Sequence, residues 1–557
     1  MKSGGRLIVE CLEAQGVERV FCVPGESYLA LLDALYDSPI ETVVCRQEGG
    51  AAMMAEAVGK LTGRPGVVMV TRGPGAANAC AGIHVAQQDS TPMILFVGQI
   101  GRDMRGRDAF QEVDYRHFFG DMTKWVAEID SAERIPEMLS RAFHVAMSGR
   151  PGPVVLALPE EMLQEAVKSS PGRRVEPADP APTPQQISSL KELLAAAKKP
   201  FVIAAGSRWE SGAVVLLQRF SECWRLPVGC SFRRQMLFDH EHPHYAGDIG
   251  LGINPALKRR ISEADLLLLV GGRFSENPSQ KFSLLNIPSP SQKLVHVHPG
   301  AEELGRIYHP DLAINATAGE FLKALQALVP PTIPTWSGVA EAAHADYLEW
   351  SGEIPATPGK LQMREVMRWL EEHLDEDAVI TNGAGNYATW VHRFHRYRRF
   401  GSQLAPTSGS MGYGLPAAIA AKLTYPRRQV ICFAGDGCFQ MTMQEFGTAL
   451  QCGANIIVLL IDNGIYGTIR MHQEREYPGR VSATTLVNPD FAALANSYGG
   501  YGECVEETGD FAAAFARAMA SRRPAILHLK LDPEAISPTT TLSRIRSMAM
   551  SPHPDTN

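Results

Sequence analysis

The feature that most constrains the fold of this chain is the recurrence of short apolar runs separated by amphipathic, helix-like stretches. In the first 165 residues these runs include RVFCV, TVVCR, GVVMVT, MILFVG and PVVLALP. The pattern resumes at PFVIAAG, DLLLLVGGRF and LVHVHPG, and again at DAVITNG, RQVICFAGDG, NIIVLLIDNG and PAILHLKL. Short strands that alternate with helices predict parallel sheets covered by helices on both faces.

Two Pro-rich, polar passages divide this alternation into three blocks, and such composition is typical of extended linkers. We therefore expect an α/β chain with three doubly wound parallel-sheet domains. The expected segments are a first domain at 1–165, a linker at 166–187, a central domain at 188–330, a linker at 331–360, a third domain at 361–535 and a Ser- and Thr-rich surface or lid segment at 536–557.

Composition excludes several classes of protein. The net charge of -7 gives no basic field, so we expect no nucleic-acid partner. No run of eighteen uncharged apolar residues occurs, so we expect no membrane span. The ten cysteines are scattered without a Cys-x-x-Cys pair, which favours reduced thiols and a cytoplasmic location.

Small polar residues follow two neighbouring strands of the third block. Asp436, in Gly-Asp-Gly, follows VICFA, and Asn463 follows IIVLLI. A right-handed crossover through the helix-length segment between them brings the two strand ends together. A carboxylate and an amide oxygen there could bind Mg²⁺, while Gly437 and the helix N-terminus receive a phosphate. The alternative for Gly-Asp-Gly alone is a helix cap, but Asn463 at the matching strand end favours a ligand site.

A second candidate lies in the first block, where RQEGGAAMMAEA places Glu48 just inside a helix start. A carboxylate in a first turn has a simple alternative role, because it interacts favourably with the helix dipole. The residue alone therefore does not identify a site.

These motifs together resemble those of thiamine-diphosphate enzymes. GDG followed about two dozen residues later by DN resembles their metal–diphosphate motif, although Asp462 replaces the first Asn of the usual Asn-Asn ending, and TRGPGAAN and MGYGLPAA are similar to further signatures. The resemblance implies that the first domain binds the cofactor's pyrimidine and the third its diphosphate. It also implies that Asp436, Asn463 and the carbonyl of Ile465 hold Mg²⁺, and that Glu48 is the acid/base group at the aminopyrimidine.

The same resemblance implies a larger set of cofactor contacts. They are Glu48, Asn386, Tyr387, Ser410, Met411, Gly435, Gly437, Cys438, Ile465 and Tyr466. Met411 would force the cofactor into a bent shape, although a methionine taken by itself is more often core filler. In this family Glu48 of one subunit faces the metal motif of another, so the resemblance implies a homodimer or homotetramer with active sites at the subunit interface.

Within the family, the chain resembles the large-subunit acetolactate synthase (acetohydroxyacid synthase) group. DAFQE, MTKW and SGRPGPVVLALP are similar to motifs of that group. The resemblance implies decarboxylation of a 2-oxo acid and transfer of the product to a carbonyl acceptor, with Gln111 and Lys124 as candidates for later steps. Lys124 has an equally good alternative as a surface lysine, and the presence of a regulatory subunit stays open.

Three departures from the group fall on one expected substrate pocket, which includes Phe110. His472 stands where the group has a Trp, Asn277 where it has an acceptor-binding Arg, and Glu26 where it has a small residue. A carboxylate at position 26 would repel a 2-oxo acid unless it is protonated or paired. The changes favour an altered substrate, and they keep a second interpretation open.

That second interpretation is a non-ligating 2-oxo acid decarboxylase, or an aldehyde or 2-hydroxyacyl-CoA lyase, on the same cofactor. A non-catalytic cofactor-binding regulator is a third possibility, which the retained Glu48 disfavours. FAD also stays open: the central domain of acetolactate synthases binds it without a redox role, and GSRW, GDIGLG and GGRF resemble parts of that site. The strand end that is usually acidic instead carries His296 and His298, and a metal site there lacks a third ligand.

Overall fold

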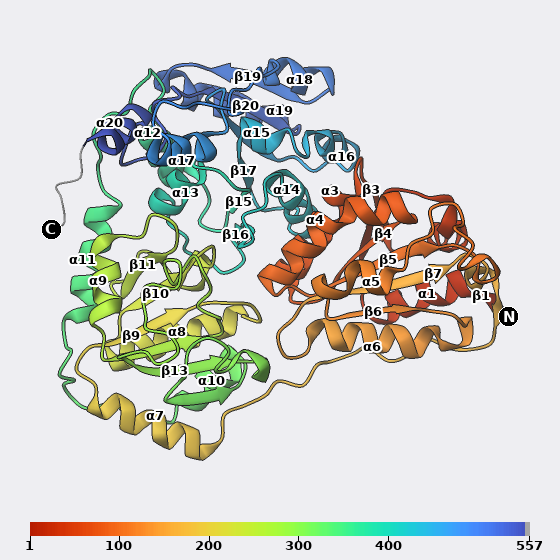
Figure 1. Cartoon of the computed structure of the whole chain (residues 1–557), viewed down its shortest axis with the longest axis horizontal. Coiled ribbons are helices and arrows are strands. Elements are labelled where there is room, and N and C mark those ends of the chain that lie inside the picture. Colours follow the sequence, from red (N-terminus) through yellow and green to blue (C-terminus); the bar gives the residue numbers. More distant parts are fainter. Residues whose placement is uncertain (552–557) are drawn as a thin grey trace.

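Three six-stranded sheets organise the chain, and helices lie between successive strands and over the sheet faces (Figure 1). The computed structural model describes residues 1–551. All strand pairs in the three sheets are parallel. The α/β fold class expected from the alternating pattern is therefore confirmed.

The first and third sheets share one strand order. Numbered by position within its own domain, each runs 2-1-3-4-6-5. The first sheet consists of β3 (Glu41–Val44), β2 (Arg19–Cys22), β4 (Gly66–Val70), β5 (Met93–Gln99), β7 (Pro153–Pro159) and β6 (Trp125–Glu128). The third consists of β16 (Gln403–Leu404), β15 (Val379–Asn382), β17 (Val430–Gly435), β18 (Ile457–Asp462), β20 (Ala525–Lys530) and β19 (Tyr501–Val505).

The central sheet has a different order, 3-2-1-4-5-6, which is that of dinucleotide-binding folds. Its strands are β11 (Tyr245–Ile249), β10 (Val228–Ser231), β9 (Pro200–Ala204), β12 (Leu266–Val270), β13 (Lys293–His298) and β14 (Leu312–Asn315). The strand order reverses between β9 and β12, and the loops after these two strands therefore flank the place where such folds bind ligands.

The helices follow the same division into three domains. The first domain contains α1 (Gly4–Ala14), α2 (Leu29–Tyr36), α3 (Glu48–Thr62), α4 (Gly73–Asp89), α5 (Tyr115–Phe119) and α6 (Ile135–Met147). The central region contains α7 (Pro184–Ala196), α8 (Ser211–Trp224), α9 (Pro255–Glu263), α10 (Ala318–Leu325) and α11 (Val339–Trp350). The third contains α12 (Met363–His373), α13 (Ala388–Phe394), α14 (Gly414–Thr424), α15 (Asp436–Phe439), α16 (Phe446–Gln451), α17 (Gly467–Glu476), α18 (Phe491–Ser497), α19 (Phe511–Ser521) and α20 (Leu542–Met550).

Helices α3 and α14 join the first domain to the third. One hydrophobic cluster of buried side chains runs through both domains, and small residues on α3 and α4 let these helices approach closely. A Cβ at Gly82 of α4 would lie 2.4 Å from that of Ala52 on α3. Near the end of α3, the buried Lys60 ammonium lies 3.1 Å from Glu56 and pairs with Asp89, and Tyr413 of the third domain donates to Glu56. The Tyr413 hydrogen bond and the shared hydrophobic cluster hold α3 against the third domain.

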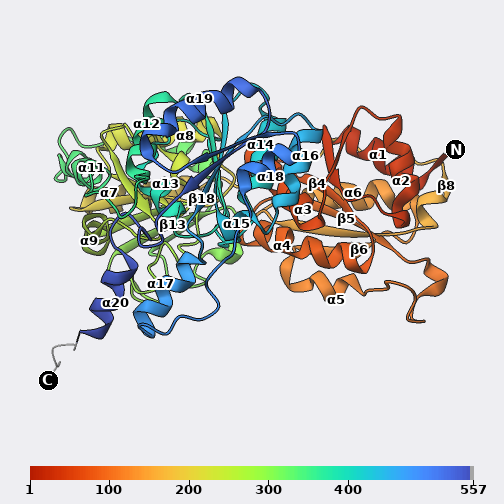
Figure 2. The ribbon, with the colours of Figure 1, turned by 90° about the horizontal axis from the view of Figure 1, so that it is seen from above.

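Both expected linkers contain ordered elements. In 166–187, β8 (Ala166–Val167) pairs with β1 (Lys2–Ser3), and α7 begins at Pro184. In 331–360, α11 packs its Tyr347 ring against Tyr245 of β11 at 4.8 Å. Seen from above, β1 near the N-terminus and α20 lie on opposite sides of the molecule (Figure 2). The expected tail contains α20, and its last residues, 552–557, lie outside the described part. Within residues 1–551 no helix is both long and apolar enough to cross a membrane.

Candidate functional site

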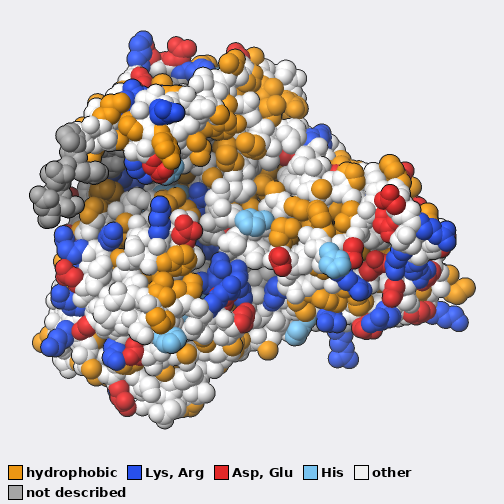
Figure 3. All heavy atoms as spheres, viewed as in Figure 1, with side chains coloured by type: hydrophobic (Ala, Val, Ile, Leu, Met, Phe, Trp, Pro, Cys, Tyr) orange, Lys and Arg blue, Asp and Glu red, His pale blue; other side chains and the backbone are white. Residues whose placement is uncertain are grey.

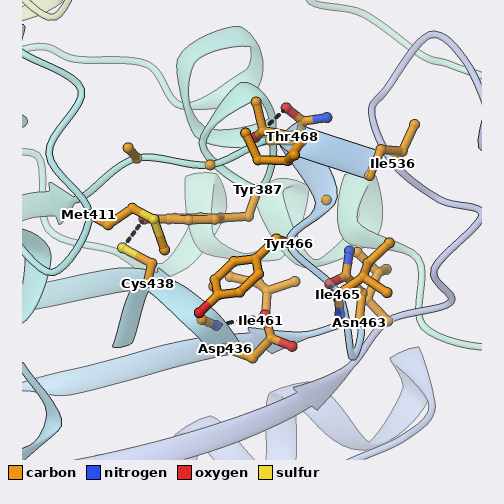
Figure 4. Close-up of a pocket in the computed structure, with 18 of the residues that line it drawn as sticks. Tyr387, Met411, Asp436, Cys438, Ile461, Asn463, Ile465, Tyr466, Thr468 and Ile536 are labelled. Carbon is orange, nitrogen blue, oxygen red and sulfur yellow. Dashed lines mark hydrogen bonds between the residues drawn. The ribbon is translucent and has the colours of Figure 1, made fainter. Parts of the chain in front are cut away.

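A cavity of about 250 Å³ lies at the carboxyl edge of the third sheet (Figure 4). Its walls come from the ends of β17 and β18, the start of α17, the loop before α14 and the segment after β20. The lining residues are Ala384, Gly385, Asn386, Tyr387, Trp390, Gly409, Met411, Gly435, Asp436, Gly437, Cys438, Ile461, Asn463, Ile465, Tyr466, Gly467, Thr468, Ile469, Leu531, Ala535 and Ile536. The structure thus brings together both strand ends that the sequence singled out.

Asp436 is the charged side chain among these lining residues, and it is buried. Its Oδ1 accepts from the backbone N–H of Gly437 at 2.8 Å, and its Oδ2 accepts from Gly464 at 2.9 Å and from the Asn488 amide at 2.7 Å. Burial raises the pKa of Asp436 to about 6, because a charged carboxylate is poorly solvated there. A bound cation would offset that cost.

Asp462, the departure from the usual Asn-Asn ending, points away from the cavity into a set of donors. Its Oδ1 accepts from Asn488 at 2.7 Å, and its Oδ2 accepts from the His528 imidazole at 2.8 Å and from Lys530 at 2.6 Å. Burial raises the pKa of Asp462, but these hydrogen bonds outweigh burial and hold it below the usual range. The extra negative charge is therefore neutralised locally by Lys530.

Asn488 was not singled out in the sequence, although it bridges the carboxylates of Asp436 and Asp462. It lies in an irregular stretch before α18, and no local pattern distinguishes it from other loop asparagines. Only the tertiary structure places its amide between the two strand ends.

Glycines at the strand ends make room for aromatic walls. A Cβ at Gly437 would lie 2.5 Å from the Tyr466 ring, and one at Gly435 would lie 2.8 Å from the Tyr387 ring. The Tyr387 hydroxyl lies 3.2 Å from the sulfur of Cys438, and Met411 lies beside this pair (Figure 4). A side chain at either glycine would clash with one of these rings, so both glycine positions have a steric reason.

The segment after β20 closes one side of the cavity. Ala535 and Ile536 line it, and Ile536 packs with residues of α20. Helix α20 docks on α17 because Arg546 forms an ion pair with Glu474, a carboxylate that is 1% exposed. His472 lies on α17 and contacts Arg475 at 3.4 Å, and it is not among the cavity-lining residues. Ser410 is also outside the lining, between Gly409 and Met411 that belong to it.

Glu48 lies at the carboxyl edge of the first sheet, at the first residue of α3, and is 8% exposed. Its Oε2 accepts from the Asn78 amide of α4 at 2.9 Å. A Cβ at Gly75 would lie 3.2 Å from its Oε1, so Gly75 leaves space beside this oxygen. Asn78, which lies in the quoted TRGPGAAN motif, is a partner that the sequence analysis did not assign.

The backbone before Glu48 is held by the third domain. Glu445 is buried, and its carboxylate accepts from the Arg46 N–H at 3.2 and 3.3 Å and from the Thr448 hydroxyl at 2.7 Å. Burial raises the pKa of Glu445. A Cβ at Gly50 would lie 2.7 Å from this carboxylate. Glu445 was not anticipated, because its partner lies almost 400 residues away in the chain.

Other expected site residues also lie along the first domain's edge. Glu26, after β2, has a side chain that is 70% exposed and lies 3.9 Å from Arg72. Gln111 adopts a left-handed backbone conformation, with φ of 65°, and its carbonyl accepts from the Gly73 N–H. Phe110 is exposed. None of these residues, nor Glu48, lines the cavity of the third domain.

The structure places the Lys124 ammonium at the end of a helix. Its ammonium donates to the carbonyls of Val145 and Ser148 at the C-terminal end of α6. Burial lowers the pKa of Lys124 to about 8, and the carbonyls of a helix end are favourable partners for a cation. Its described contacts are those of a helix cap.

The cleft of the central domain is divided into two small cavities, of about 70 and 80 Å³, which share Ser90, Gly206 and Arg234 as lining residues. Small-molecule sites are typically about 300–1,000 Å³. Arg234 bridges the divide, with its Nε donating to Gly206 O at 2.8 Å and its Nη2 to Asp89 O at 3.1 Å. GGRF and GSRW line these cavities, and neither cavity alone reaches the volume of a typical cofactor site.

Three arginines in this cleft donate hydrogen bonds to the C-terminal end of α4. They bind its last carbonyls: Arg150 to Gln87, Arg273 to Gln88 and Arg234 to Asp89. Lys and Arg side chains gather where the central domain meets the first (Figure 3). His296 contacts the Gly272 carbonyl and His298 the backbone of Gly300, and no cluster of three or more His, Cys, Asp or Glu suited to a metal occurs among residues 1–551.

Comparisons with known proteins agree with this architecture. Three family models match: "Thiamine pyrophosphate enzyme, N-terminal TPP binding domain" at residues 2–118, the central domain at 187–325 and the C-terminal TPP binding domain at 383–529. The chain belongs to the thiamine pyrophosphate enzyme family, and it is a thiamine-pyrophosphate-dependent enzyme.

Within that family it stands near the acetolactate synthases. It is 31% identical over 532 residues to acetolactate synthase isozyme 2 large subunit of Escherichia coli, covering 95% of this chain and 96% of that one. It is 33% identical over 526 residues to acetolactate synthase of Mycobacterium bovis (91% and 84%) and 32% identical over 520 residues to the acetolactate synthase large subunit of Lactococcus lactis (89% and 87%). The resemblance drawn from the motifs is confirmed.

Proposed function

We propose that this enzyme decarboxylates a 2-oxo acid with thiamine diphosphate and Mg²⁺, and transfers the product to a carbonyl acceptor. The observation that carries the proposal is the pairing of two strand-end sites: a cavity built around Asp436 in the third domain, and a buried Glu48 held by Asn78 in the first. A protein that only bound a diphosphate would not require the second of these sites, the buried Glu48. The acetolactate synthase relatives support the ligation step.

The cavity has the donor set that Mg²⁺ prefers. Asp436 supplies a carboxylate whose burial favours a cation partner, and Asn463 and Ile465 contribute an amide and a carbonyl oxygen to the same wall. Gly437 lets the Tyr466 ring lie against the glycine loop, and both residues line the cavity that would receive the diphosphate. The thiazolium of the bound cofactor supplies an electron sink for the loss of CO₂.

The chain's own groups divide the remaining work. Asn78 orients the Glu48 carboxyl, which holds or releases a proton at the aminopyrimidine. Met411 and Ile536 are apolar walls that exclude water from the reacting end. The acetolactate synthase relatives support a 2-oxo acid as the substrate class.

We further propose that a complete site needs two copies of the chain. The lining of the third-domain cavity includes no residue of the first domain. Glu48 therefore completes a site on a second copy, in a homodimer or a tetramer of such dimers. FAD is not part of the proposal, because Arg234 divides the central cleft.

The test is a product screen with purified enzyme, thiamine diphosphate and Mg²⁺. Pyruvate and other 2-oxo acids, alone and with aldehyde or 2-oxo acid acceptors, should release CO₂ and give ligated products. Release of CO₂ together with formation of only the simple aldehyde, and no ligated product, would favour a non-ligating decarboxylase. Failure to release CO₂ from the whole panel would refute the proposal. The purified protein should show no flavin absorbance.

A further inference from the structure

The third-domain cavity lacks a group that could hold an anionic substrate. Among its lining residues there is no Lys, Arg or His, and its one charge is the carboxylate of Asp436. Asn277, at the position where an acceptor-binding Arg is expected, lines a separate cavity of the central domain. A 2-oxo acid therefore needs a cation from elsewhere.

The first domain offers one at the equivalent strand end. Because the two sheets share one strand order, the loop after β4 corresponds to the loop after β17. The loop after β17 carries Asp436, and the loop after β4 carries Arg72. The counterpart of the expected metal ligand thus has the opposite charge.

Arg72 lies close to Glu48. It is the residue before α4, and Gly75 and Asn78, in the first turns of that helix, are the residues beside the Glu48 carboxyl. Arg72 thus leads into the helix whose first turns flank the Glu48 carboxyl, which places it at the first-domain end of the proposed site.

The Arg72 guanidinium is only partly satisfied. Its side chain is 10% exposed, and its Nη2 donates to Glu160 at 3.1 Å. Its Nε is buried and has no hydrogen-bond partner among the described residues. An unpaired buried donor costs about 1–3 kcal/mol, so such a group calls for an explanation.

Glu26 indicates what the missing partner is. Its carboxylate lies 3.9 Å from Arg72 Nη2, which is beyond hydrogen-bond distance, and its side chain is 70% exposed. A carboxylate thus already forms a loose ion pair with the guanidinium, at a distance too long for a hydrogen bond. A guanidinium fork matches a carboxylate in a bidentate pair.

We propose that Arg72 binds the carboxylate of the 2-oxo acid, and that Glu26 is a competing carboxylate which the substrate displaces. The inference rests on the proposed 2-oxo acid chemistry and assigns the recognition of its anionic group. Glu160 keeps the guanidinium in place through its one hydrogen bond. The proposal therefore predicts opposite effects on substrate binding when Arg72 and Glu26 are each replaced by a neutral residue.

The experiment measures equilibrium binding of oxamate, an unreactive 2-oxo acid mimic, and of neutral oxamide to the enzyme loaded with thiamine diphosphate and Mg²⁺. Arg72→Gln should weaken oxamate binding about tenfold or more and leave oxamide unchanged, and Arg72→Lys should restore part of the loss. Glu26→Gln should tighten oxamate binding severalfold. Arg134→Gln, which breaks an exposed pair with Glu137, is the matched control and should change neither.

Equal oxamate binding by wild type and Arg72→Gln, or no binding by wild type, would overturn the inference. So would a parallel loss in Arg72→Gln and Glu26→Gln, because a purely structural ion pair would weaken both. The cofactor affinity and the midpoint of thermal unfolding are measured for each variant, so that a misfolded variant is recognised. If Arg72→Gln is misfolded, the comparison uses Arg72→Lys in its place. Arg72-dependent oxamate binding with no CO₂ from the substrate panel would refute the proposed reaction and leave the carboxylate site standing.

Discussion

The carboxyl edges of the first and third sheets are built on the same strand order, yet they carry different chemistry. The third-domain edge is a walled cavity with Asp436 beneath aromatic and apolar side chains. The first-domain edge presents Glu48 beside a largely exposed Glu26 and a partly satisfied Arg72, and it contributes nothing to that cavity. In the proposed reaction, one topology thus provides a binding half around Asp436 and an activating half around Glu48, and each needs the other.

The largest effect should come from the activating half. Glu48→Gln should lower turnover by about 100- to 10,000-fold, since a general acid/base group contributes that much. Cofactor affinity should stay within about tenfold, or 1.4 kcal/mol, because the binding half is intact. Steady-state rates and a thiamine diphosphate titration measure the two. Full activity in this variant would show that Glu48 is not the acid/base group, and that the first-domain edge does not have the proposed activating role.

The binding half should respond in the opposite way. Asp436→Ala should weaken Mg²⁺-dependent cofactor binding by about 100-fold or more, because loss of even an outer-shell partner of a metal costs up to about 100-fold and Asp436 is proposed as a direct ligand. Asp462→Asn is the matched control: its carboxylate points to Lys530 and His528, so cofactor binding should change far less. Each variant is titrated with cofactor, once in the presence of Mg²⁺ and once in the presence of EDTA, and the two affinities give the Mg²⁺-dependent part of cofactor binding. Equal losses would place the metal at Asp462 as well.

Mixing the two defective proteins tests whether the halves meet between subunits. A heterodimer of Glu48→Gln and Asp436→Ala has one site with both changes and one intact site, so random exchange should restore about a quarter of wild-type activity. Co-expression with two affinity tags yields the hybrid. No recovery in a purified hybrid would show that both halves act within one chain.

The smallest effect concerns the link between the halves. Glu445→Ala leaves the Arg46 N–H without its acceptor and should lower the free energy of unfolding by about 1–3 kcal/mol. Because that backbone leads into Glu48, turnover should fall more than cofactor affinity. Thermal unfolding and kinetics provide the measurements, and Glu320→Ala, at an exposed pair with Lys323, is the control. An unchanged free energy of unfolding would show that Glu445 does not position the backbone before Glu48.

Much of the fold was predictable because its signals are local. Apolar runs of strand length between amphipathic helices gave three parallel sheets, and the Gly-Asp-Gly and Asp-Asn-Gly ends gave the place of the cavity. Two Pro-rich passages were expected to be extended, and α11 in the second shows why composition is a weaker signal: Tyr347 gains a packing partner in Tyr245 that no local pattern reveals.

The sequence by itself therefore determined the strand ends and the positions of Asp436 and Glu48, and its resemblance to thiamine-diphosphate enzymes indicated the class of cofactor and the candidate roles of these two residues. The positions depend on residues adjacent in the chain, where spacing alone places a side chain at a strand end or a helix start. The tertiary structure decided which groups surround them: Asn488 and Lys530 at the carboxylates of the third domain, Asn78 at Glu48, and Arg72 between Glu160 and Glu26. It also placed Lys124 on the end of α6. These contacts join residues that are distant in the chain, and the folding of the backbone alone brings them within hydrogen-bond distance.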